Sequence, residues 1–288
     1  MLFNLCLRHD ISHKIKQLNE TLDKILKERV MLGINLNRQR GVDERPPTTS
    51  FVDESDIIGR DKYRDDLVSN LLGKGSQEER NPHVISLVGM GGIGKSTFAQ
   101  LAYNHPEVKA YFPIRMWACV SDIFDPCKVA KAIIQEVDPK HESINKVTEF
   151  LTLLHEIHDL IREKKFFPVL DDVWIEDYTN WVSFKNVLKC GAQGSGILVT
   201  TRKSSVAGMM ESSYIINLGE LSLDDCWSMF SKIAFSNKDL HQCRDLEELG
   251  KQLAKMCKGL PLAAKSLGSH MCGKRSKEEW EIVLHSSL

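Results

Sequence analysis

The sequence of 288 residues has no long apolar run, because none of its uncharged stretches approaches the roughly 18 residues that a membrane-spanning helix needs. It also has no excess of either charge: 38 lysines and arginines stand against 39 aspartates and glutamates, for a formal net charge of −1. A protein that coats nucleic acid is usually clearly basic, so the charge disfavours that class. The apolar opening Met1–Leu7 is short and has neither a basic leader nor a small-residue cleavage site, so we expect no signal peptide and a cytoplasmic protein.

Cysteine pairs are missing as well. The eight cysteines never form Cys-x-x-Cys and their spacing does not repeat. In a chain of this length, that pattern argues against a disulfide framework and against a zinc site. We therefore expect reduced thiols, most of them buried.

The first 50 residues predict a helix followed by a linker. Over residues 11–32, apolar side chains recur at alternating steps of four and three, with Arg29 interrupting the seam. Such a stripe lies along one side of a helix that packs on a partner. The charge in the seam makes one helix of a small helical domain (1–32) a better interpretation than a coiled coil, which stays open. The polar stretch 33–50, which contains Pro46-Pro47, predicts the linker.

From residue 51 onward the pattern changes to that of an α/β domain. Short β-rich runs alternate with amphipathic helical stretches, which is typical of a parallel sheet with crossover helices. Because the glycine-rich sequence GMGGIGKS at 89–96 lies between a β-rich run and a helical stretch, we predict a P-loop NTPase fold with a five-stranded parallel sheet and flanking helices over 51–220, followed by a small all-helical subdomain over 221–288. The predicted strands are 84–88, 114–120, 166–170, 197–200 and 214–218. The predicted helices are 95–104, 127–137, 147–163 and 203–210 in the first domain, and 223–235, 245–257, 261–271 and 277–284 in the second.

The strongest motif is Gly89-Met90-Gly91-Gly92-Ile93-Gly94-Lys95-Ser96, which matches G-x-x-x-x-G-K-[ST] in full between a predicted strand and a predicted helix. Glycines let the backbone N–H groups turn inward around phosphates, and the start of the helix adds partial positive charge. We expect Lys95 to reach the β- and γ-phosphates and Ser96 to ligate Mg²⁺, with Thr97 near the α-phosphate. In this context a glycine-rich turn with an incidental lysine is strongly disfavoured.

A pair of acidic residues follows the third predicted strand. Asp171 comes directly after an apolar run, so it should lie at the carboxyl end of the strand beside the P-loop, where we assign it to Mg²⁺. Asp172 is expected to orient a water molecule, and an aspartate in this place predicts slow turnover at most. Helix capping by both residues is the weaker alternative. Pro168 is unexpected in a central strand because proline cannot donate to the ladder.

Arg202 ends the fourth predicted strand, at the sheet edge where ligands of open α/β sheets bind. An arginine there can bind a terminal phosphate through its forked donors, and we prefer this sensor role to that of a solvated surface arginine.

Six motifs occur in a fixed order: the P-loop 89–97, FPIRMWACVSD over 112–122, LDDVW over 170–174, GSGILVTTR over 194–202, the stretch 221–235 and GLPLA over 259–263. Together they resemble the NB-ARC domain of plant nucleotide-binding leucine-rich-repeat disease-resistance proteins. The coiled-coil subclass of the RGA type fits best, because Trp174 follows Asp-Asp-Val and a helical segment precedes the linker. The resemblance covers roughly residues 50–288.

The resemblance implies roles that spacing does not give. It makes Val52 and the run Ile57-Ile58-Gly59-Arg60 the adenine-side segment, Pro261 the residue that packs on the adenine, and Arg202 the first sensor. It also implies a signal-transducing ATPase that exchanges ADP for ATP, with subdomain rotation, oligomerisation and immune signalling as the consequences.

The sequence departs from the family pattern at both ends. About one helix stands where a four-helix N-terminal bundle is expected, and neither the winged-helix subdomain with its Met-His-Asp motif nor the leucine-rich repeats are found. We therefore expect a truncated member of the family.

The leading hypothesis is an ADP- or ATP-binding switch of plant innate immunity that uses Mg²⁺. We expect it to self-associate or pair with related proteins through the N-terminal helix and the nucleotide-binding domain, with no nucleic-acid partner. An adaptor or decoy that pairs with full-length relatives, with nucleotide only as a structural element, is the alternative from another class. A kinase or helicase is disfavoured because no substrate-binding insert is recognisable and the near-neutral charge gives no nucleic-acid track.

Overall fold

The computed structural model describes residues 48–52, 57–73, 81–120, 125–174 and 178–286. The predicted helix 11–32 and most of the predicted linker 33–50 lie outside these residues. Within the described residues, no helix combines the length and the apolar character needed to cross a membrane.

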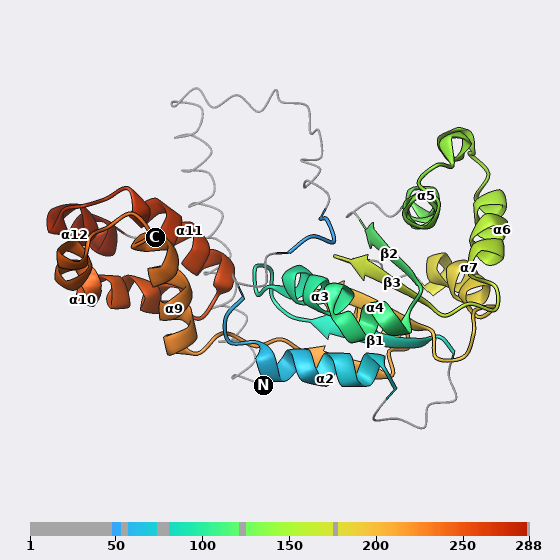
Figure 1. Cartoon of the computed structure of the whole chain (residues 1–288), viewed down its shortest axis with the longest axis horizontal. Helices are drawn as coiled ribbons and strands as arrows, with labels where there is room; N and C mark the ends of the chain where they lie inside the picture. The colour runs from blue at the N-terminus through green and yellow to red at the C-terminus, as the bar shows by residue number, and fades with distance from the viewer. Residues whose placement is uncertain (1–47, 53–56, 74–80, 121–124, 175–177, 287–288) are drawn as a thin grey trace, which may run out of the picture. The chain divides into compact units, whose positions relative to one another are not determined.

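Five parallel strands form one sheet in the order β2-β3-β4-β1-β5 (Figure 1). The strands are β1 (His83–Val88), β2 (Ile114–Cys119), β3 (Phe166–Asp171), β4 (Gly196–Thr201) and β5 (Tyr214–Asn217). The predicted five-stranded parallel sheet is confirmed, and each strand end lies within one residue of its prediction. The inner strands β3 and β4 are buried throughout, as expected for a sheet covered on both faces.

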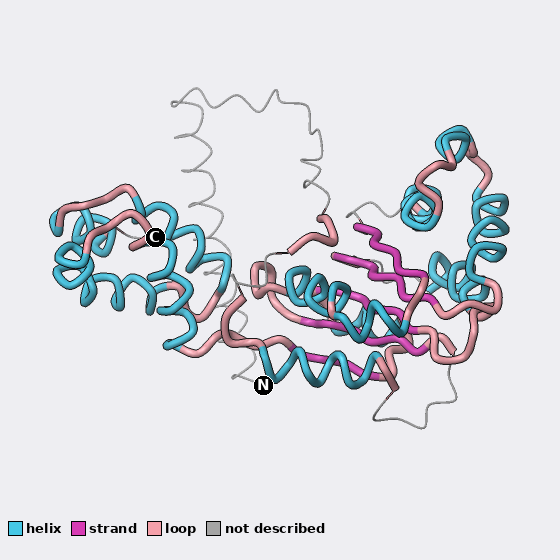
Figure 2. The backbone as a smooth tube through the Cα atoms, viewed as in Figure 1, coloured by secondary structure: helices cyan, strands magenta, loops and turns pink. Residues whose placement is uncertain are grey.

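Helices cover both faces of the sheet, and Figure 2 shows them around the strands. One face packs on α2 (Asp61–Leu71), α3 (Lys95–Asn104) and α4 (Pro106–Tyr111). The other face packs on α5 (Pro126–Val137), α6 (Phe150–Ile161), α7 (Tyr178–Leu188) and α8 (Ser204–Met209), with the short 3₁₀ helix η2 (Glu142–Lys146) before α6. Side chains of β3 alternate between the two faces of the sheet. Phe167 and Val169 pack in the core under α2, α3 and α4, and Phe166 and Leu170 pack in the core under α5 to α8.

Three of these helices are not predicted from the sequence: α2, α4 and α7. The helix α4 is only six residues long and begins with Pro106 at its first position, so it offers no periodicity to detect. The predicted helix 147–163 begins later than expected, at Phe150, because Val147 and Glu149, between η2 and the helix, have extended backbone angles.

The C-terminal part is helical, as predicted. Its helices are α9 (Leu223–Ala234), α10 (Leu240–Met256), α11 (Pro261–Cys272) and α12 (Lys277–His285), which pack around the fully buried Phe230 and Trp280. The helix α10 begins five residues before its predicted start. Its N-cap Asp239 accepts from the N–H of Gln242, and the Gln242 side chain returns to the backbone of Asp239. This capping box fixes the earlier start.

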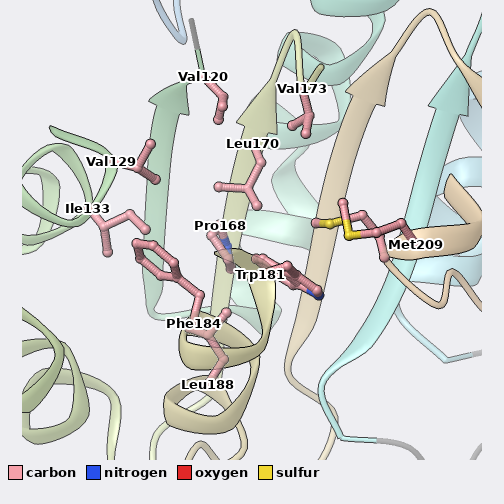
Figure 3. A pocket seen from close by; sticks show the side chains of 11 residues that line it. Val120, Val129, Ile133, Pro168, Leu170, Val173, Trp181, Phe184, Leu188 and Met209 are labelled. Atoms are coloured by element: carbon pink, nitrogen blue, oxygen red, sulfur yellow. The ribbon is translucent and has the colours of Figure 1, made fainter. Parts of the chain in front are cut away.

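Pro168 shortens the ladder between β3 and β4. Pairing of β3 with β2 runs through Pro168, but pairing with β4 begins at Val169, opposite Leu198. Pro168 therefore lies in a central strand at a place where the missing N–H is not needed by β4. Its ring lines an apolar cavity of about 20 Å³ together with Leu170 and side chains from α5 and α7 (Figure 3).

The seven cysteines of the described residues are free thiols. Cys226 and Cys257 are buried and the other five are half-buried, so the expectation of mostly buried thiols is wrong for those five.

Candidate functional site

The P-loop lies at the carboxyl edge of the sheet, between β1 and α3. Gly89 follows the last residue of β1, and its N–H donates to the carbonyl oxygen of Thr201 at the end of β4 (3.2 Å). Gly92 and Gly94 have φ values of +78° and +94°, in the left-handed region that glycine adopts without strain. These two glycines therefore allow the sharp turns that bring the loop backbone to the start of α3.

Lys95 is the first residue of α3 and is buried. Its Nζ donates to the carbonyl oxygens of Gly89 (2.9 Å) and Met90 (3.0 Å). The ammonium is therefore held against the loop itself, next to the positive end of the helix dipole. Ser96 and Thr97 follow in the same first turn and are half-buried.

Asp171 is the last residue of β3, with no exposed surface. Its Oδ1 accepts from Oγ1 of Thr200 (2.5 Å) and its Oδ2 accepts from Oγ1 of Thr48 (2.7 Å). The strand register brings β1, β3 and β4 to the same edge, so Asp171 and the P-loop share it. A carboxylate held by two hydroxyl groups inside the protein does not cap a helix, so the capping alternative is wrong for Asp171.

Asp172 leaves the strand in a left-handed conformation, with φ at +55°. Its N–H donates to Oγ1 of Thr200 (2.9 Å), and its Oδ1 lies 3.8 Å from Nε of Arg202. The Thr200 hydroxyl thus bonds to both aspartates: its oxygen accepts from the N–H of Asp172, and its hydrogen is donated to the carboxylate of Asp171. The Asp172 side chain is about three-quarters buried and paired with a cation.

Arg202 follows β4 and packs over the P-loop. A Cβ placed on Gly91 would lie 3.0 Å from Nη1 of Arg202, so a larger residue there would require the guanidinium to shift. The guanidinium also lies over the ring of Trp174, with Cζ at 4.7 Å from the centroid. Arg202 is therefore part of the site and not a solvated surface arginine.

Three properties of this edge fit a nucleoside polyphosphate with Mg²⁺. Nε of Arg202 is buried and has no hydrogen-bond acceptor within the part of the chain that the structure describes. The first-turn N–H groups of α3 have no acceptors within the helix, as at every helix start, and they suit phosphate oxygens. The Ser96 hydroxyl and the Asp171 carboxylate are the hard oxygen donors that Mg²⁺ prefers.

The segment before α2 ties the P-loop to the helical subdomain. Nη2 of Arg60 donates to the carbonyl oxygens of Ile93 (3.2 Å) and Gly219 (2.8 Å). Burial lowers the pKa of the Arg60 guanidinium below its ordinary value, although Tyr63 and Asp225 oppose the shift. Gly59 has a φ of +73°, and a Cβ there would lie 2.5 Å from the Asp225 carboxylate of α9.

The start of α11 also contacts the P-loop. Pro261 is the first residue of this helix, and the N–H of the next residue, Leu262, donates to the carbonyl oxygen of Gly92 (3.1 Å). A Cβ on Gly92 would lie 2.9 Å from Cβ of Leu262. The structure thus brings Pro261 beside the loop, while Val52 packs on the sheet-domain core that includes Ile93.

Four residues beside the site were not singled out in the sequence, although the last three lie within longer motifs: Thr48, Thr200, Asp225 and Leu262. Thr48 lies in the predicted linker, 123 residues from the aspartate that it contacts. Thr200 precedes Thr201 and Arg202 in an apolar strand, and its position opposite Asp171 follows only from the register. The sequence offers only a weak signal for Thr200, namely that polar residues at the carboxyl ends of neighbouring parallel strands lie close together.

A complete P-loop after β1, an aspartate ending β3 and an arginine after β4 define a nucleotide-binding domain of the P-loop class. The family model described as NB-ARC domain matches residues 64–240, and the chain belongs to this family. It is 33% identical to the disease resistance protein RGA2 of Solanum bulbocastanum over 281 residues, which cover 98% of this chain and 29% of that protein. The chain spans less than a third of the length of such relatives.

Solved structures share the fold. The Aeropyrum pernix ORC1 protein in complex with DNA matches with a TM-score of 0.55 and 14% identity, over 80% of this chain and 65% of that chain. The Aeropyrum pernix ORC2 protein in its ADP form matches with a TM-score of 0.53 and 11% identity, over 83% of this chain and 71% of that chain. At such identities the likeness concerns the fold alone.

Proposed function

We propose that this chain binds ADP or ATP together with Mg²⁺ and acts as a molecular switch of plant innate immunity. The observation that carries the proposal is the convergence of the P-loop, Asp171 and Arg202 on one sheet edge, where α11 also contacts the loop. The names of the relatives, which are disease resistance proteins, support the immune role.

The phosphates are bound by the loop 89–94 and the first turn of α3. Lys95 exchanges its carbonyl partners for the β- and γ-phosphate oxygens, and Thr97 lies near the α-phosphate. Arg202 directs its guanidinium at the terminal phosphate, which the glycine at position 91 allows.

Ser96 and Asp171 are the residues that would hold Mg²⁺. The cation supplies charge neutralisation between the phosphates when it is bound. Asp171 suits this role because its carboxylate is buried and fixed by two hydroxyl groups.

The adenine side is formed by Val52, Ile58, Gly59 and Arg60 on one side and by Pro261 on the other. Ile58 packs against the helical-subdomain core, while Arg60 bonds to the P-loop residue Ile93. The base would therefore lie between the two subdomains. The γ-phosphate that distinguishes ATP from ADP would act at the P-loop, which α11 contacts, so that the two nucleotides favour different subdomain positions.

Hydrolysis, where it occurs, is slow phosphoryl transfer to water with Asp172 orienting the water. The Asp172 carboxylate already faces a cation, since its Oδ1 lies 3.8 Å from Nε of Arg202. Slow turnover suits a switch, because the ATP-bound state must last long enough to signal.

The test is nucleotide binding by a Lys95→Ala variant. A fluorescent ADP analogue should bind the wild-type chain and lose at least about a hundredfold in affinity in the variant, since a charge-assisted contact to phosphate is removed. Lys109→Ala, on the exposed face of α4, is the matched control. Unchanged affinity in Lys95→Ala would refute the proposal.

The same variant separates the switch from an adaptor. In the switch, pairing with full-length relatives through the N-terminal helix and the nucleotide-binding domain depends on nucleotide. A pull-down in which Lys95→Ala keeps full partner binding and signalling would favour the adaptor.

A further inference from the structure

Residues Thr48–Val52, which we call the strap, lie against the sheet domain next to α3 and are drawn in blue in Figure 1. Two amide side chains of α3 hold the strap backbone: Gln100 donates to the carbonyl oxygen of Thr49, and Asn104 donates to that of Ser50 (2.6 Å). Val52 packs on the core beneath. The strap is thus fixed along its length and not merely a spacer.

The strap places one hydroxyl group on the most buried carboxylate of the site. Oγ1 of Thr48 donates to Oδ2 of Asp171 (2.7 Å) and accepts from Nε1 of Trp117 (3.3 Å). Since the indole can only donate, it leaves the Thr48 hydrogen for the carboxylate. The Thr48 hydroxyl thus has a donor on one side and an acceptor on the other, and Trp117 helps to orient it toward the carboxylate.

The other carboxylate oxygen is held in the same way. Oγ1 of Thr200 donates to Oδ1 of Asp171 and accepts from the N–H of Asp172. Each oxygen of Asp171 thus receives one hydroxyl that is oriented by an N–H group. Hydrogen bonds of this length fix the rotation of the carboxylate, while leaving lone pairs for a further ligand.

We propose that Thr48 is a positioning residue for Asp171, so that the docked strap completes the Mg²⁺ site. This inference rests on the proposed function of Asp171. Outer partners of metal-binding groups orient them and tune their affinity. Undocking the strap frees one carboxylate oxygen and lets Asp171 rotate, which weakens Mg²⁺ binding and with it ATP binding, whereas nucleotide binding without metal is unaffected.

The experiment titrates Mg²⁺ into the full chain with a fluorescent ATP analogue, and repeats the binding of a fluorescent ADP analogue in EDTA. The Thr48→Val variant keeps the shape of the side chain and loses the hydroxyl. It should need about tenfold more Mg²⁺ for half-maximal binding, with unchanged affinity in EDTA. Thr48→Ser, which keeps the hydroxyl, should behave like the wild type, as should Thr49→Val, whose side chain is exposed.

The outcomes separate the inference from the proposed function. An unchanged Mg²⁺ midpoint in Thr48→Val, or an equal loss of affinity with and without Mg²⁺, overturns the role of Thr48 and leaves the proposed function of the wild-type chain standing. Absence of binding to the wild-type chain overturns both. Should Thr48→Val fail to fold, Trp117→Phe removes the donor that orients Thr48 and must raise the Mg²⁺ midpoint in the same direction.

Discussion

Two glycines of the P-loop have similar backbone angles and different surroundings. Both Gly92 and Gly94 have positive φ, but a Cβ on Gly92 would lie 2.9 Å from Leu262, whereas a Cβ on Gly94 would meet nothing within 4 Å. Gly92 is therefore favoured both by its backbone conformation and by its contact with Leu262, whereas Gly94 is favoured by its backbone conformation alone.

This difference predicts unequal costs for Gly92→Ala and Gly94→Ala. Gly94→Ala should lose about 1 kcal/mol of unfolding free energy through backbone strain alone. Gly92→Ala should lose more, because Leu262 has to move. Urea unfolding of both variants without nucleotide measures the difference, and Leu262→Gly, which removes the contacting Cβ, should abolish it when Gly92→Ala is compared with wild type in that background. Equal costs for the two alanines would contradict the contact.

Single residues also show what the sequence could tell about the site. Lys95, Asp171 and Arg202 were predictable because each stands at a fixed offset from an apolar strand. Thr48 and Thr200 were not, because their role depends on strand register and on a contact across 123 residues of sequence. Hydroxyl groups that orient a carboxylate do not stand at a fixed sequence spacing from it, so no motif predicts them.

Among the strands, β3 combines a central position with a proline. Pro168 faces the α5 and α7 side, where it borders the apolar cavity next to Trp181 and Phe184 (Figure 3). The pairing with β4 starts only after this residue, and its ring lines the cavity.

We predict that Pro168→Leu stabilises the domain. Leucine adds apolar volume to the cavity and restores a backbone donor in the strand, which together should raise the unfolding free energy by about 1 kcal/mol. Thermal unfolding measures this gain. Pro113→Leu, the same change at an exposed position before β2, should give none. A lower melting temperature for Pro168→Leu would show that the cavity is too narrow for the new side chain.

Elements with strong periodicity were predictable, and short or weakly patterned ones were not. The five strands were found because each is a compact apolar run bounded by polar residues. The helices α2 and α4 escaped prediction, since α2 is largely polar and α4 is shorter than two turns. The early start of α10 depends on a local capping box, which shifts a boundary without changing the apolar pattern.

The sheet domain and the helical subdomain have separate apolar cores. A single guanidinium nitrogen of Arg60 bonds to the P-loop and to the segment leading into α9. Arg60 therefore contributes to the coupling between the two parts, together with the bond from the N–H of Leu262 to the carbonyl oxygen of Gly92.

We predict that Arg60→Met weakens this coupling. Methionine keeps an apolar stem but leaves the carbonyl oxygens of Ile93 and Gly219 without this donor, so the unfolding free energy should fall by about 2 kcal/mol. Urea unfolding followed by tryptophan fluorescence and by circular dichroism should then give transitions that no longer coincide. Arg64→Met removes only exposed ion pairs and should change stability by less than about 1 kcal/mol. Coincident transitions at the wild-type midpoint would contradict the proposed coupling.

Ile57 and Ile58 are neighbours in the chain, yet Ile57 packs on the sheet-domain core and Ile58 on the helical-subdomain core. Because these two adjacent side chains pack in different hydrophobic cores, the backbone between them cannot change in length without displacing one of them. An inserted or deleted residue at this point would pull one isoleucine out of its pocket, so chain length here is under tight constraint. Homologues should vary in loop length elsewhere and keep this dipeptide junction free of insertions.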